Sequence, residues 1–374
     1  MKILICNDLV YGGGAETLLR TFVKVFVKRG YRVTVMASPN SKKDFSAAFP
    51  AEVHCFRGRW PKRTNKSNTF QYAFNALFRK VYRLFIILKV SLLNFDLVIA
   101  FKEGRIMKDV SFLRAKRKIA WIQCDVSTLH QQHWYKDIFP SIDRERKCVQ
   151  SFEKVICVSE TVKESVIKSI GNTENLFVRY NPIDVKKILQ LSKEKCEYCK
   201  ENGRRLIVSV GRLDPVKNYI TLLEASSLLS NKTDFDLWIV GDGPQRKELE
   251  DYIQKKSLKN VKLLGFQKNP FSILDQADLF ISSSVSEGYG LSVQEALILG
   301  VPVIAVKCSG IEETLDTRFG VLVDNSPEKM ANAIETVLDN SEILDRFRKE
   351  IKEKYPLDNL FQDRMNEICR LLEE

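Results

Sequence analysis

The chain contains the stretch Glu287-Gly-Tyr-Gly-Leu-Ser-Val-Gln-Glu295, in which two glutamates bracket a glycine-rich turn. An apolar run, Asp278 to Ser282, precedes the turn and predicts a strand, and an apolar helical pattern follows it. We therefore expect the turn at the carboxyl edge of a sheet, where open α/β folds bind ligands. Gly288 and Gly290 would let the backbone approach phosphate oxygens, and the free N–H groups of the helix favour negative charge. The stretch predicts an α/β fold with a nucleotide-sugar site.

Strand-like runs rich in Val, Ile and Leu alternate with helical patterns along the whole chain. The runs are Lys2–Cys6, Arg32–Ala37, Asp96–Ala100, Lys118–Ile122, Leu206–Val210, Leu237–Val240 and Val303–Val306. Continuous apolar strands between helices are typical of parallel sheets covered on both faces. The chain has 374 residues, and a single hydrophobic core rarely grows past about 300 residues. We expect two Rossmann-like domains.

The boundary between the domains is predicted at Tyr180-Asn-Pro-Ile-Asp184, where an Asn-Pro turn breaks the pattern before a lysine-rich segment. This predicts domains at residues 1–184 and 185–355, followed by a terminal segment at residues 356–374. The terminal helix is expected over Leu357–Leu372, after the Tyr355-Pro356 step.

Cysteine usage and hydropathy predict a cytoplasmic chain without a structural metal. Only Cys196 and Cys199 form a close cysteine pair, and the chain has three histidines, so a zinc site is not expected. The chain opens on the strand Lys2–Cys6 without a signal-peptide pattern. No run reaches the about 18 apolar residues that would span a membrane.

Much of the net charge of +12 lies between Val53 and Phe95, a segment without acidic residues. Its nine positive residues are Arg57, Arg59, Lys62, Arg63, Lys66, Arg79, Lys80, Arg83 and Lys89. Aromatic residues alternate with these charges, and Phe70 to Leu93 is predicted to form an amphipathic helix. Such a helix suits the anionic inner leaflet of a membrane. The alternative is a helix whose aromatic face packs on the sheet. Nucleic acid is not an expected partner, because no nucleic-acid-binding motif accompanies the charge.

Four motifs occur together in this chain. They are Gly12-Gly-Gly-Ala-Glu16, Gly211-Arg-Leu-Asp-Pro-Val-Lys-Asn218, Gly241-Asp-Gly-Pro244 and the Glu287 to Glu295 stretch. Together they resemble a retaining glycosyltransferase of the GT-B fold, family 4 (glycosyl transferases group 1), over nearly the whole chain. The resemblance implies two Rossmann-like domains with parallel sheets that face each other across a deep cleft. It also implies a terminal helix that crosses back to the first domain.

The resemblance also implies an activity. A sugar would move from a nucleoside-diphosphate sugar, expected to be UDP-linked, to a glycan or lipid-linked glycan acceptor. The context would be synthesis of a surface polysaccharide such as lipopolysaccharide or capsule, at the inner face of the membrane. Two alternatives stay open. One is hydrolysis or epimerisation of the nucleotide-sugar, and the other is a regulatory protein that binds it without efficient transfer.

Arg212 and Lys217 follow the strand Leu206–Val210, with Lys217 expected to begin the next helix. Fixed cations at a strand end can stabilise charge that develops on a leaving diphosphate, and the resemblance implies this role for both residues. Glu287 is expected to face the sugar, and Glu295, about two turns inside its helix, to reach the ribose. The other donor-binding residues that we expect are Gly13, Gly14, Gly211, Gly241, Gly243, Phe266, Gly288, Tyr289, Gly290 and Leu291.

The acceptor side is predicted from fewer residues. Glu16 would border the acceptor, and Arg79, Lys80 and Arg83 would face the acceptor or the membrane. In Ala120-Trp-Ile-Gln-Cys-Asp125 this chain departs from the family, because many relatives carry a histidine at the position of Gln123. Glutamine can hydrogen-bond a sugar hydroxyl but cannot titrate.

Catalysis is predicted without an enzymic nucleophile. Asp125 is the candidate to accept a proton from the acceptor hydroxyl or to orient it. His130 and His133 could compensate for Gln123, or they could be ordinary surface groups. The resemblance implies a front-face substitution in which the departing phosphate helps to deprotonate the acceptor. No cofactor and no metal ion are expected.

Overall fold

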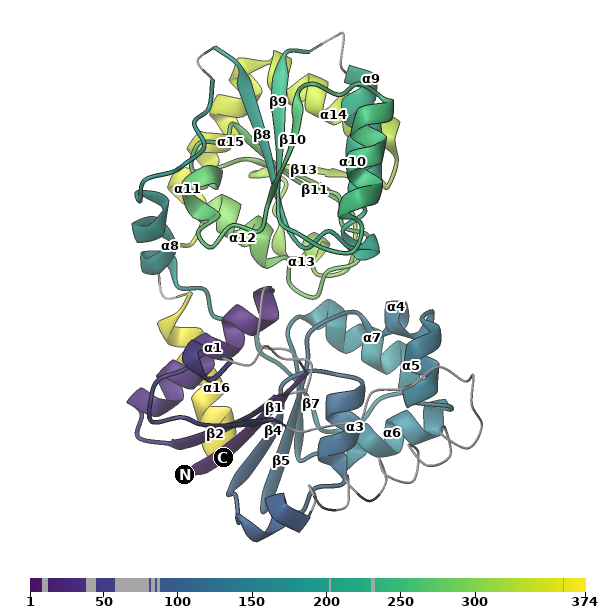
Figure 1. Cartoon of the computed structure of the whole chain (residues 1–374), viewed down its shortest axis with the longest axis vertical. Coiled ribbons are helices and arrows are strands. Elements are labelled where there is room, and N and C mark those ends of the chain that lie inside the picture. The colour runs from purple at the N-terminus through teal and green to yellow at the C-terminus, as the bar shows by residue number, and fades with distance from the viewer. Residues whose placement is uncertain are drawn as a thin grey trace. The chain divides into compact units, whose positions relative to one another are not determined.

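The computed structural model describes residues 1–8, 13–37, 45–57, 81, 85, 88–201, 203–229, 233–358 and 360–374. The chain divides into two compact units, which Figure 1 displays in one view. The first unit comprises Met1–Val158 and Val162–Arg179, and the second comprises Ser159–Thr161 and Tyr180–Glu374. Ser159–Thr161 thus belongs to the second unit although its sequence neighbours belong to the first.

The first unit is built on a parallel sheet with the strand order β3-β2-β1-β4-β5-β6-β7. The strands are β1 (Lys2–Asn7), β2 (Arg32–Ala37), β3 (His54–Arg57), β4 (Leu97–Ala100), β5 (Arg117–Ile122), β6 (Lys154–Cys157) and β7 (Leu176–Val178). The connections contain α1 (Gly14–Lys28), the 3-10 turn η1 (Phe45–Ala48), α3 (Arg105–Ser111), α4 (Val126–His130), α5 (His133–Ile138), α6 (Ile142–Gln150) and α7 (Glu160–Ile170). Helix α1 lies on one side of the sheet, and α3, α5 and α6 lie on the other (Figure 1).

The first sheet is buried because apolar helix faces cover it. The apolar stripe of α1, spaced at helical intervals, is buried: Leu18, Leu19, Phe22, Val23 and Phe26. Phe22 lies 5.4 Å from both Phe101 and Trp121, measured between ring centroids. Burying a side chain of this size contributes roughly 1.5–3 kcal/mol to folding.

The second unit has a parallel sheet with the strand order β10-β9-β8-β11-β12-β13. The strands are β8 (Arg205–Val210), β9 (Phe235–Val240), β10 (Val261–Gly265), β11 (Leu279–Ser282), β12 (Val303–Val306) and β13 (Gly320–Val323). The helices are α8 (Val185–Ser192), the 3-10 turn η2 (Pro215–Lys217), α9 (Tyr219–Leu229), α10 (Arg246–Lys255), α11 (Phe271–Leu274), α12 (Leu291–Ile298), α13 (Ile311–Thr314), α14 (Pro327–Asp339), α15 (Ser341–Lys354) and α16 (Gln362–Glu373). Helices α9, α10 and α14 flank one side of the sheet, and α11 and α12 flank the other (Figure 1).

The predicted fold class is confirmed, because both units are α/β with parallel sheets, and each predicted strand is present. The helix predicted from Phe70 to Leu93 falls largely outside the described residues, of which 81, 85 and 88–92 are helical. The contacts divide the chain between Arg179 and Tyr180. The domain limits given above, the cleft and the crossing of the terminal helix remain predictions.

Three local predictions need correction. Lys217 lies in η2 and does not begin a helix, because Asn218 takes a left-handed conformation with φ of 50° and separates η2 from α9. Glu295 is the fifth residue of α12, so it lies about one turn inside the helix and not two. The last helix begins at Gln362 and not at Leu357.

Candidate functional site

The carboxyl edge of the second sheet gathers most of the residues that we predicted to bind the donor. Strands β8 and β11 are neighbours there, with β9 on the far side of β8 and β12 on the far side of β11. Where strand order reverses in this way, a crevice opens beyond the carboxyl ends of the strands. The loop from Gly211 to Lys217 follows β8, and the turn from Ser283 to Gly290 follows β11, so both border this point.

Lys217 and Glu287 form an ion pair at this edge. The Lys217 Nζ donates a hydrogen bond to Glu287 Oε1 at 2.5 Å, and the two side chains are 22% and 15% exposed. Burial lowers the pKa of Lys217, but the charge of Glu287 and its hydrogen bond outweigh burial, so the pKa lies above its usual value. Lys217 is therefore a fixed positive charge that a carboxylate holds in place.

Two further hydrogen bonds join the segments that carry this pair. The Val285 N–H donates to the Val216 carbonyl oxygen at 2.9 Å. The Ser283 hydroxyl donates to the Lys217 carbonyl oxygen at 2.7 Å. These bonds fix the backbone around Lys217 to the segment that follows β11. A charge held in place in this way needs little rearrangement when negative charge develops beside it.

Arg212 lies on the same loop and is more exposed. Its side chain is 58% exposed, and its Nε lies 3.9 Å from Asp214 Oδ2. An anion can approach this guanidinium without first breaking a short ion pair. The structure therefore brings Lys217 and Glu287 together and leaves Arg212 open to solvent.

Glu295 lies in the first turns of α12 and is partly buried. Burial raises its pKa to about 7, and the nearby charge of Lys217 offsets part of this effect. The carboxyl group therefore keeps its proton to a higher pH than an ordinary glutamate does. As a carboxylate it can accept hydrogen bonds from hydroxyls, and as a neutral acid it can also donate one.

Two glycines lie where a Cβ would come very close to a neighbouring atom. Gly241 has φ of +149°, and a Cβ at this position would lie 1.8 Å from the Gly211 carbonyl oxygen. Gly290 has φ of +65°, and its Cβ would lie 2.5 Å from Ile311 Cδ1. The other predicted donor-binding residues of this unit also follow strand ends: Gly211 after β8, Gly243 after β9, Phe266 after β10, and Gly288, Tyr289 and Leu291 around the start of α12.

Sequence reasoning missed Arg364, which holds the glycine-rich turn from the terminal helix. Its Nη1 donates to the Tyr289 hydroxyl at 2.6 Å and to the Asn181 carbonyl oxygen at 2.8 Å. Its guanidinium also lies over the rings of Tyr180 and Tyr289, 5.5 and 5.4 Å from their centroids. Tyr289 and Arg364 are 75 residues apart in the sequence, so no local pattern could have linked them.

Glu313 of α13 is a second residue that the sequence did not reveal. It accepts hydrogen bonds from the Tyr180 hydroxyl at 2.7 Å, from Glu160 N–H at 3.0 Å and from Thr161 N–H at 2.9 Å. Burial alone would raise the pKa of Glu313, but the hydrogen bonds from Thr161 and Tyr180 hold it below the usual value. Ser159, in the same short segment, donates to the Gly288 carbonyl oxygen at 2.7 Å. These contacts fix the backbone around the glycine-rich turn.

The carboxyl edge of the first sheet carries Gln123. Its backbone N–H donates to Glu103 Oε2 at 2.8 Å, and Glu103 is 8% exposed. Its side-chain Nε2 is buried and finds no hydrogen-bond partner among the described residues. A buried amide N–H without a partner is unfavourable by roughly 1–3 kcal/mol. This donor therefore suits a ligand oxygen.

Asp125 and His130 have structural partners. Asp125 caps helix α4, since its Oδ1 accepts hydrogen bonds from the N–H of Ser127 at 2.8 Å and from its hydroxyl at 2.5 Å. His130 Nε2 lies 2.7 Å from a carboxylate oxygen of Glu145, which is 3% exposed. His130 is thus partly exposed and paired with Glu145, and its role in the reaction remains a prediction. His133 begins α5.

Glu16 lies at the same edge, in the first turn of α1. It is 8% exposed, and burial raises its pKa. Lys102, directly after β4, pairs with Asp8 at 3.3 Å. A Cβ on Gly13 would lie 2.2 Å from Glu16 Oε2, so glycine leaves room for this carboxylate. Gly14 begins α1. Lys102 and Glu103 were missed, although a charged pair directly after an apolar strand is a usable signal.

The structure leaves several predictions untested. Arg79, Lys80 and Arg83 lie outside the described residues. Within the described ranges, no group of three or more His, Cys, Asp or Glu side chains could hold a metal ion. No helix in the described part of the chain is long and apolar enough to cross a membrane. Independence of metals and cofactors remains a prediction.

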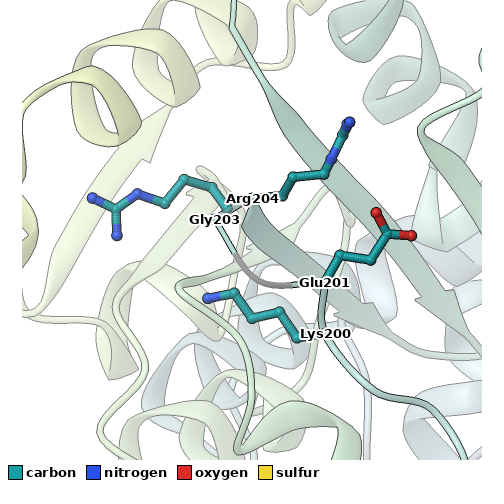
Figure 2. A pocket seen from close by; sticks show the side chains of 5 residues that line it. Lys200, Glu201, Gly203 and Arg204 are labelled. Atoms are coloured by element: carbon teal, nitrogen blue, oxygen red, sulfur yellow. The ribbon is translucent and has the colours of Figure 1, made fainter.

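A pocket lies at the opposite end of the second sheet, before β8, and is bordered by Lys200, Glu201, Gly203, Arg204 and Arg205 (Figure 2). Its cations are already paired. Arg204 lies 2.9 and 3.2 Å from Asp234 and Asp236, and Arg205 and Lys200 pair with Asp278. Asp234 and Asp236 are separated by one residue, an Asp-x-Asp spacing, and both carboxylates pair with Arg204. This pocket is therefore not a candidate for the donor site.

Comparisons with known proteins agree with the geometry. Residues 190–354 match the family "Glycosyl transferases group 1", and residues 12–187 match "Glycosyltransferase Family 4". A Campylobacter jejuni N-acetylgalactosamine-N,N'-diacetylbacillosaminyl-diphospho-undecaprenol 4-alpha-N-acetylgalactosaminyltransferase is 34% identical over 201 residues, which cover 50% of this chain and 52% of that protein. A poly(ribitol-phosphate) alpha-N-acetylglucosaminyltransferase of Staphylococcus aureus is 29% identical over 171 residues, 43% of this chain and 35% of the relative. The match thus spans about half or less of these curated relatives.

Solved structures resemble the whole chain. The Anabaena protein HepE in complex with UDP-glucose superposes with a TM-score of 0.74 at 19% identity, over 99% of this chain and 100% of that chain. TarM of S. aureus in a complex that includes UDP gives a TM-score of 0.74 at 15% identity, over 100% of both chains. At these identities the likeness shows the fold.

Proposed function

This chain belongs to the family 4 glycosyltransferases of the GT-B fold, and from this premise we propose that it transfers a sugar from a UDP-linked donor to a glycan or lipid-linked glycan. We propose further that the transfer retains the anomeric configuration and serves synthesis of a surface polysaccharide. The observation that carries this proposal is the Lys217–Glu287 pair at the carboxyl edge of the second sheet. It places a fixed cation where strand order reverses, beside the start of α12.

The donor diphosphate would bind between this cation and the helix start. A leaving diphosphate gains negative charge as the glycosidic bond breaks, and fixed positive groups stabilise it in the transition state. Lys217 supplies a charge held at 2.5 Å from Glu287, and Arg212 supplies an exposed guanidinium. The first N–H groups of α12 add backbone donors and the positive end of a helix dipole.

The sugar and the nucleoside would be held by the two glutamates of the motif. Glu287 can accept a hydrogen bond from a sugar hydroxyl with the carboxylate oxygen that Lys217 does not occupy. Glu295, whose pKa burial raises to about 7, would accept hydrogen bonds from the ribose hydroxyls. Support for UDP comes from the HepE and TarM structures, whose complexes contain UDP-glucose or UDP.

The acceptor would bind at the first sheet, where Gln123 offers a buried N–H donor. Because glutamine cannot titrate, it would position a hydroxyl of donor or acceptor and not move a proton. Asp125 already caps α4, so we assign it to orientation of this segment. The acceptor proton would pass to the departing phosphate, in a front-face substitution for which we propose no metal ion.

We also propose that the enzyme works at the inner face of a membrane. The C. jejuni relative is named for a diphospho-undecaprenol glycan, which is a lipid-linked acceptor. The segment from Val53 to Phe95 has nine positive and no acidic residues. Such a segment is attracted to anionic headgroups.

A transfer assay tests the function. UDP-sugars are first screened by thermal shift, and those that bind are then incubated with and without a lipid-linked glycan. Transfer predicts a product only when the acceptor is present, and NMR of the new linkage should show the anomeric configuration of the donor. Acceptor-independent loss of UDP would instead indicate hydrolysis, and binding without turnover would indicate a regulatory protein. Lys193→Ala, which removes a surface lysine paired with Asp275 at 2.9 Å, is the matched control for Lys217→Ala.

A further inference from the structure

Tyr219, the first residue of α9, is a buried tyrosine close to the Lys217–Glu287 pair. Its side chain is 2% exposed, and a buried tyrosine hydroxyl usually requires a hydrogen-bond partner inside the protein. Tyr219 and Lys217 line one small cavity at the carboxyl ends of β8 and β11. The polar residues that share this cavity with them are Ser209, Ser282, Ser283 and Ser284. The tyrosine therefore shares a polar space with the lysine that we assign to the donor diphosphate.

The backbone of Gly211 shows how closely the tyrosine hydroxyl and the lysine side chain approach one point. A Cβ on Gly211 would lie 2.9 Å from the Tyr219 hydroxyl oxygen, 3.2 Å from Lys217 Cε and 3.4 Å from Lys217 Cδ. The hydroxyl and the last methylene carbons of Lys217 thus border the space that glycine leaves open. The contact joins three elements, because Gly211 follows β8, Lys217 lies in η2 and Tyr219 begins α9.

The Tyr219 hydroxyl is tied to the centre of the second sheet through Ser209. The two hydroxyls are hydrogen-bonded, and Ser209 Oγ donates to the Ile281 carbonyl oxygen of β11 at 2.6 Å. Burial raises the pKa of Tyr219 to about 12, while the charge of Lys217 and the bond with Ser209 offset part of this rise. The hydroxyl is therefore a neutral, fixed group at neutral pH.

Lys217 needs support along its side chain, because four flexible carbons separate its ammonium from the backbone. Glu287 holds the ammonium end, and Ser283 holds the backbone carbonyl. Neither contact restrains the carbons between these two ends. The Tyr219 hydroxyl borders Cδ and Cε of Lys217 across the space at Gly211. Packing of this kind restricts a functional side chain to one rotamer.

We propose that Tyr219 is a positioning residue, whose hydroxyl keeps the Lys217 side chain directed at the donor diphosphate. The inference rests on the proposed function, because it assumes that Lys217 binds this diphosphate. Tyr219 is buried, so its contribution to donor binding would act through the lysine and not through contact with the substrate. Removal of the hydroxyl should therefore have an effect only while Lys217 is present.

A double-mutant cycle on UDP affinity tests the proposal with the full-length chain. Calorimetric titration with UDP compares wild type, Tyr219→Phe, Lys217→Ala and the double variant. Tyr219→Phe keeps the ring and removes the hydroxyl, and it should weaken UDP binding about fivefold. In the Lys217→Ala background the same change should alter the affinity by less than about twofold. Tyr252→Phe, at a partly buried tyrosine of α10 that packs on the core, is the matched control and should bind UDP like wild type.

Two results would overturn the proposal while Lys217→Ala still weakens UDP binding. One is wild-type affinity in Tyr219→Phe, and the other is an equal loss in both backgrounds, which would indicate a general effect on the fold. Ser209→Ala removes the partner of the hydroxyl and should reproduce the loss, so it replaces Tyr219→Phe if that variant does not fold.

The same titrations separate this proposal from the proposed function. Unchanged UDP affinity in Lys217→Ala would overturn the donor site and the role of Tyr219 together. The predicted coupling in a protein that transfers no sugar would contradict the proposed transfer but support the role of Tyr219, because UDP binding is measured without an acceptor.

Discussion

The described residues at the carboxyl edges of the two sheets differ in their charged groups. At the second sheet, Lys217 is held by Glu287 and Arg212 is exposed, so the edge is ready for an anion. At the first sheet, acidic side chains surround one lysine, and the Gln123 amide has a free buried donor. These acidic residues are Asp8, Glu16 and Glu103. Among these described groups, the fixed Lys217 and the exposed Arg212 suit a diphosphate, and the three carboxylates beside Lys102 do not. This difference supports our proposal that the donor phosphates bind at the second edge and a neutral, hydroxyl-bearing group at the first.

The largest effect that the comparison predicts is on Lys217. We expect Lys217→Ala to lower kcat by roughly 100- to 1,000-fold, because a preorganised cation beside the leaving group is lost. Initial rates with a saturating UDP-sugar provide the measurement, and circular dichroism confirms folding. Lys193→Ala should keep wild-type rates. A folded Lys217→Ala enzyme with an unchanged rate would show that the diphosphate does not bind at this edge.

The next largest effect concerns stability and pH at Glu295. Burial raises the folded-state pKa of Glu295 to about 7 from its usual value of 4.5, so the folded state binds this proton more tightly than the unfolded chain does. This contribution is complete below about pH 4.5 and is lost as the pH rises through about 7. Glu295→Gln removes the titration. The variant should therefore gain about 2 kcal/mol relative to wild type between pH 5 and pH 8.

Urea unfolding at the two pH values checks this expectation. Glu353→Gln, an exposed glutamate of α15, is the control and should show no such change. If the difference between wild type and Glu295→Gln did not depend on pH, Glu295 would be ionised throughout and the second edge would be more solvated than described.

Sequence patterns predicted the second edge better than the first, for a physical reason. Its glycines and charged residues directly follow strands. The alternation of strand-like and helical patterns along the sequence is therefore enough to place them at one sheet edge. Gly241 is one of these glycines, since it directly follows β9. Its backbone has φ of +149° and a Cβ would lie 1.8 Å from the Gly211 carbonyl oxygen, so only glycine fits. The contacts that steady this edge join distant segments. Tyr180 and Glu313 are separated by 133 residues, and hydrogen bonds over such distances leave no periodic trace.

The first edge was harder to predict because side chains of catalytic residue types make structural contacts there. Asp125 follows a strand as a catalytic base would, but it caps α4. His130 has the residue type of a proton carrier, but it is paired with a buried glutamate. Glu103, which accepts the backbone N–H of Gln123, was overlooked although it lies just beyond β4.

A third prediction sharpens the role of the first edge. Gln123→Ala should lower kcat about tenfold, because one neutral hydrogen bond to a sugar hydroxyl is lost. Gln123→His should retain much of the activity, since the family resemblance implies a histidine at this position and both side chains can donate a hydrogen bond. The measurement is steady-state kinetics with both substrates varied. Gln131→Ala, an exposed glutamine of the same unit, serves as the control. Wild-type rates in Gln123→Ala would show that the Gln123 side chain does not contribute to catalysis.

The smallest effect is predicted for Arg364, which contacts Tyr289 of the glycine-rich turn. Arg364→Ala should raise the KM for the UDP-sugar about fivefold and leave kcat nearly unchanged, because the turn loses the hydrogen bond to the Tyr289 hydroxyl. Arg364→Lys should restore part of the affinity by keeping the charge over the two rings. Arg370→Ala, exposed on the same helix, is the control. A fall in kcat with unchanged KM would contradict a positioning role.

Calorimetric titration with UDP tests most directly whether the diphosphate binds at the second edge and not at the first. Wild type, Lys217→Ala and Gln123→Ala are titrated under identical conditions, without sugar or acceptor. The account predicts that Lys217→Ala binds UDP at least about tenfold more weakly than wild type, since a charge-assisted contact is lost. Gln123→Ala should bind UDP within about twofold of wild type, because no phosphate lies at the first edge. Loss of UDP binding in Gln123→Ala, with normal binding in Lys217→Ala, would contradict the account.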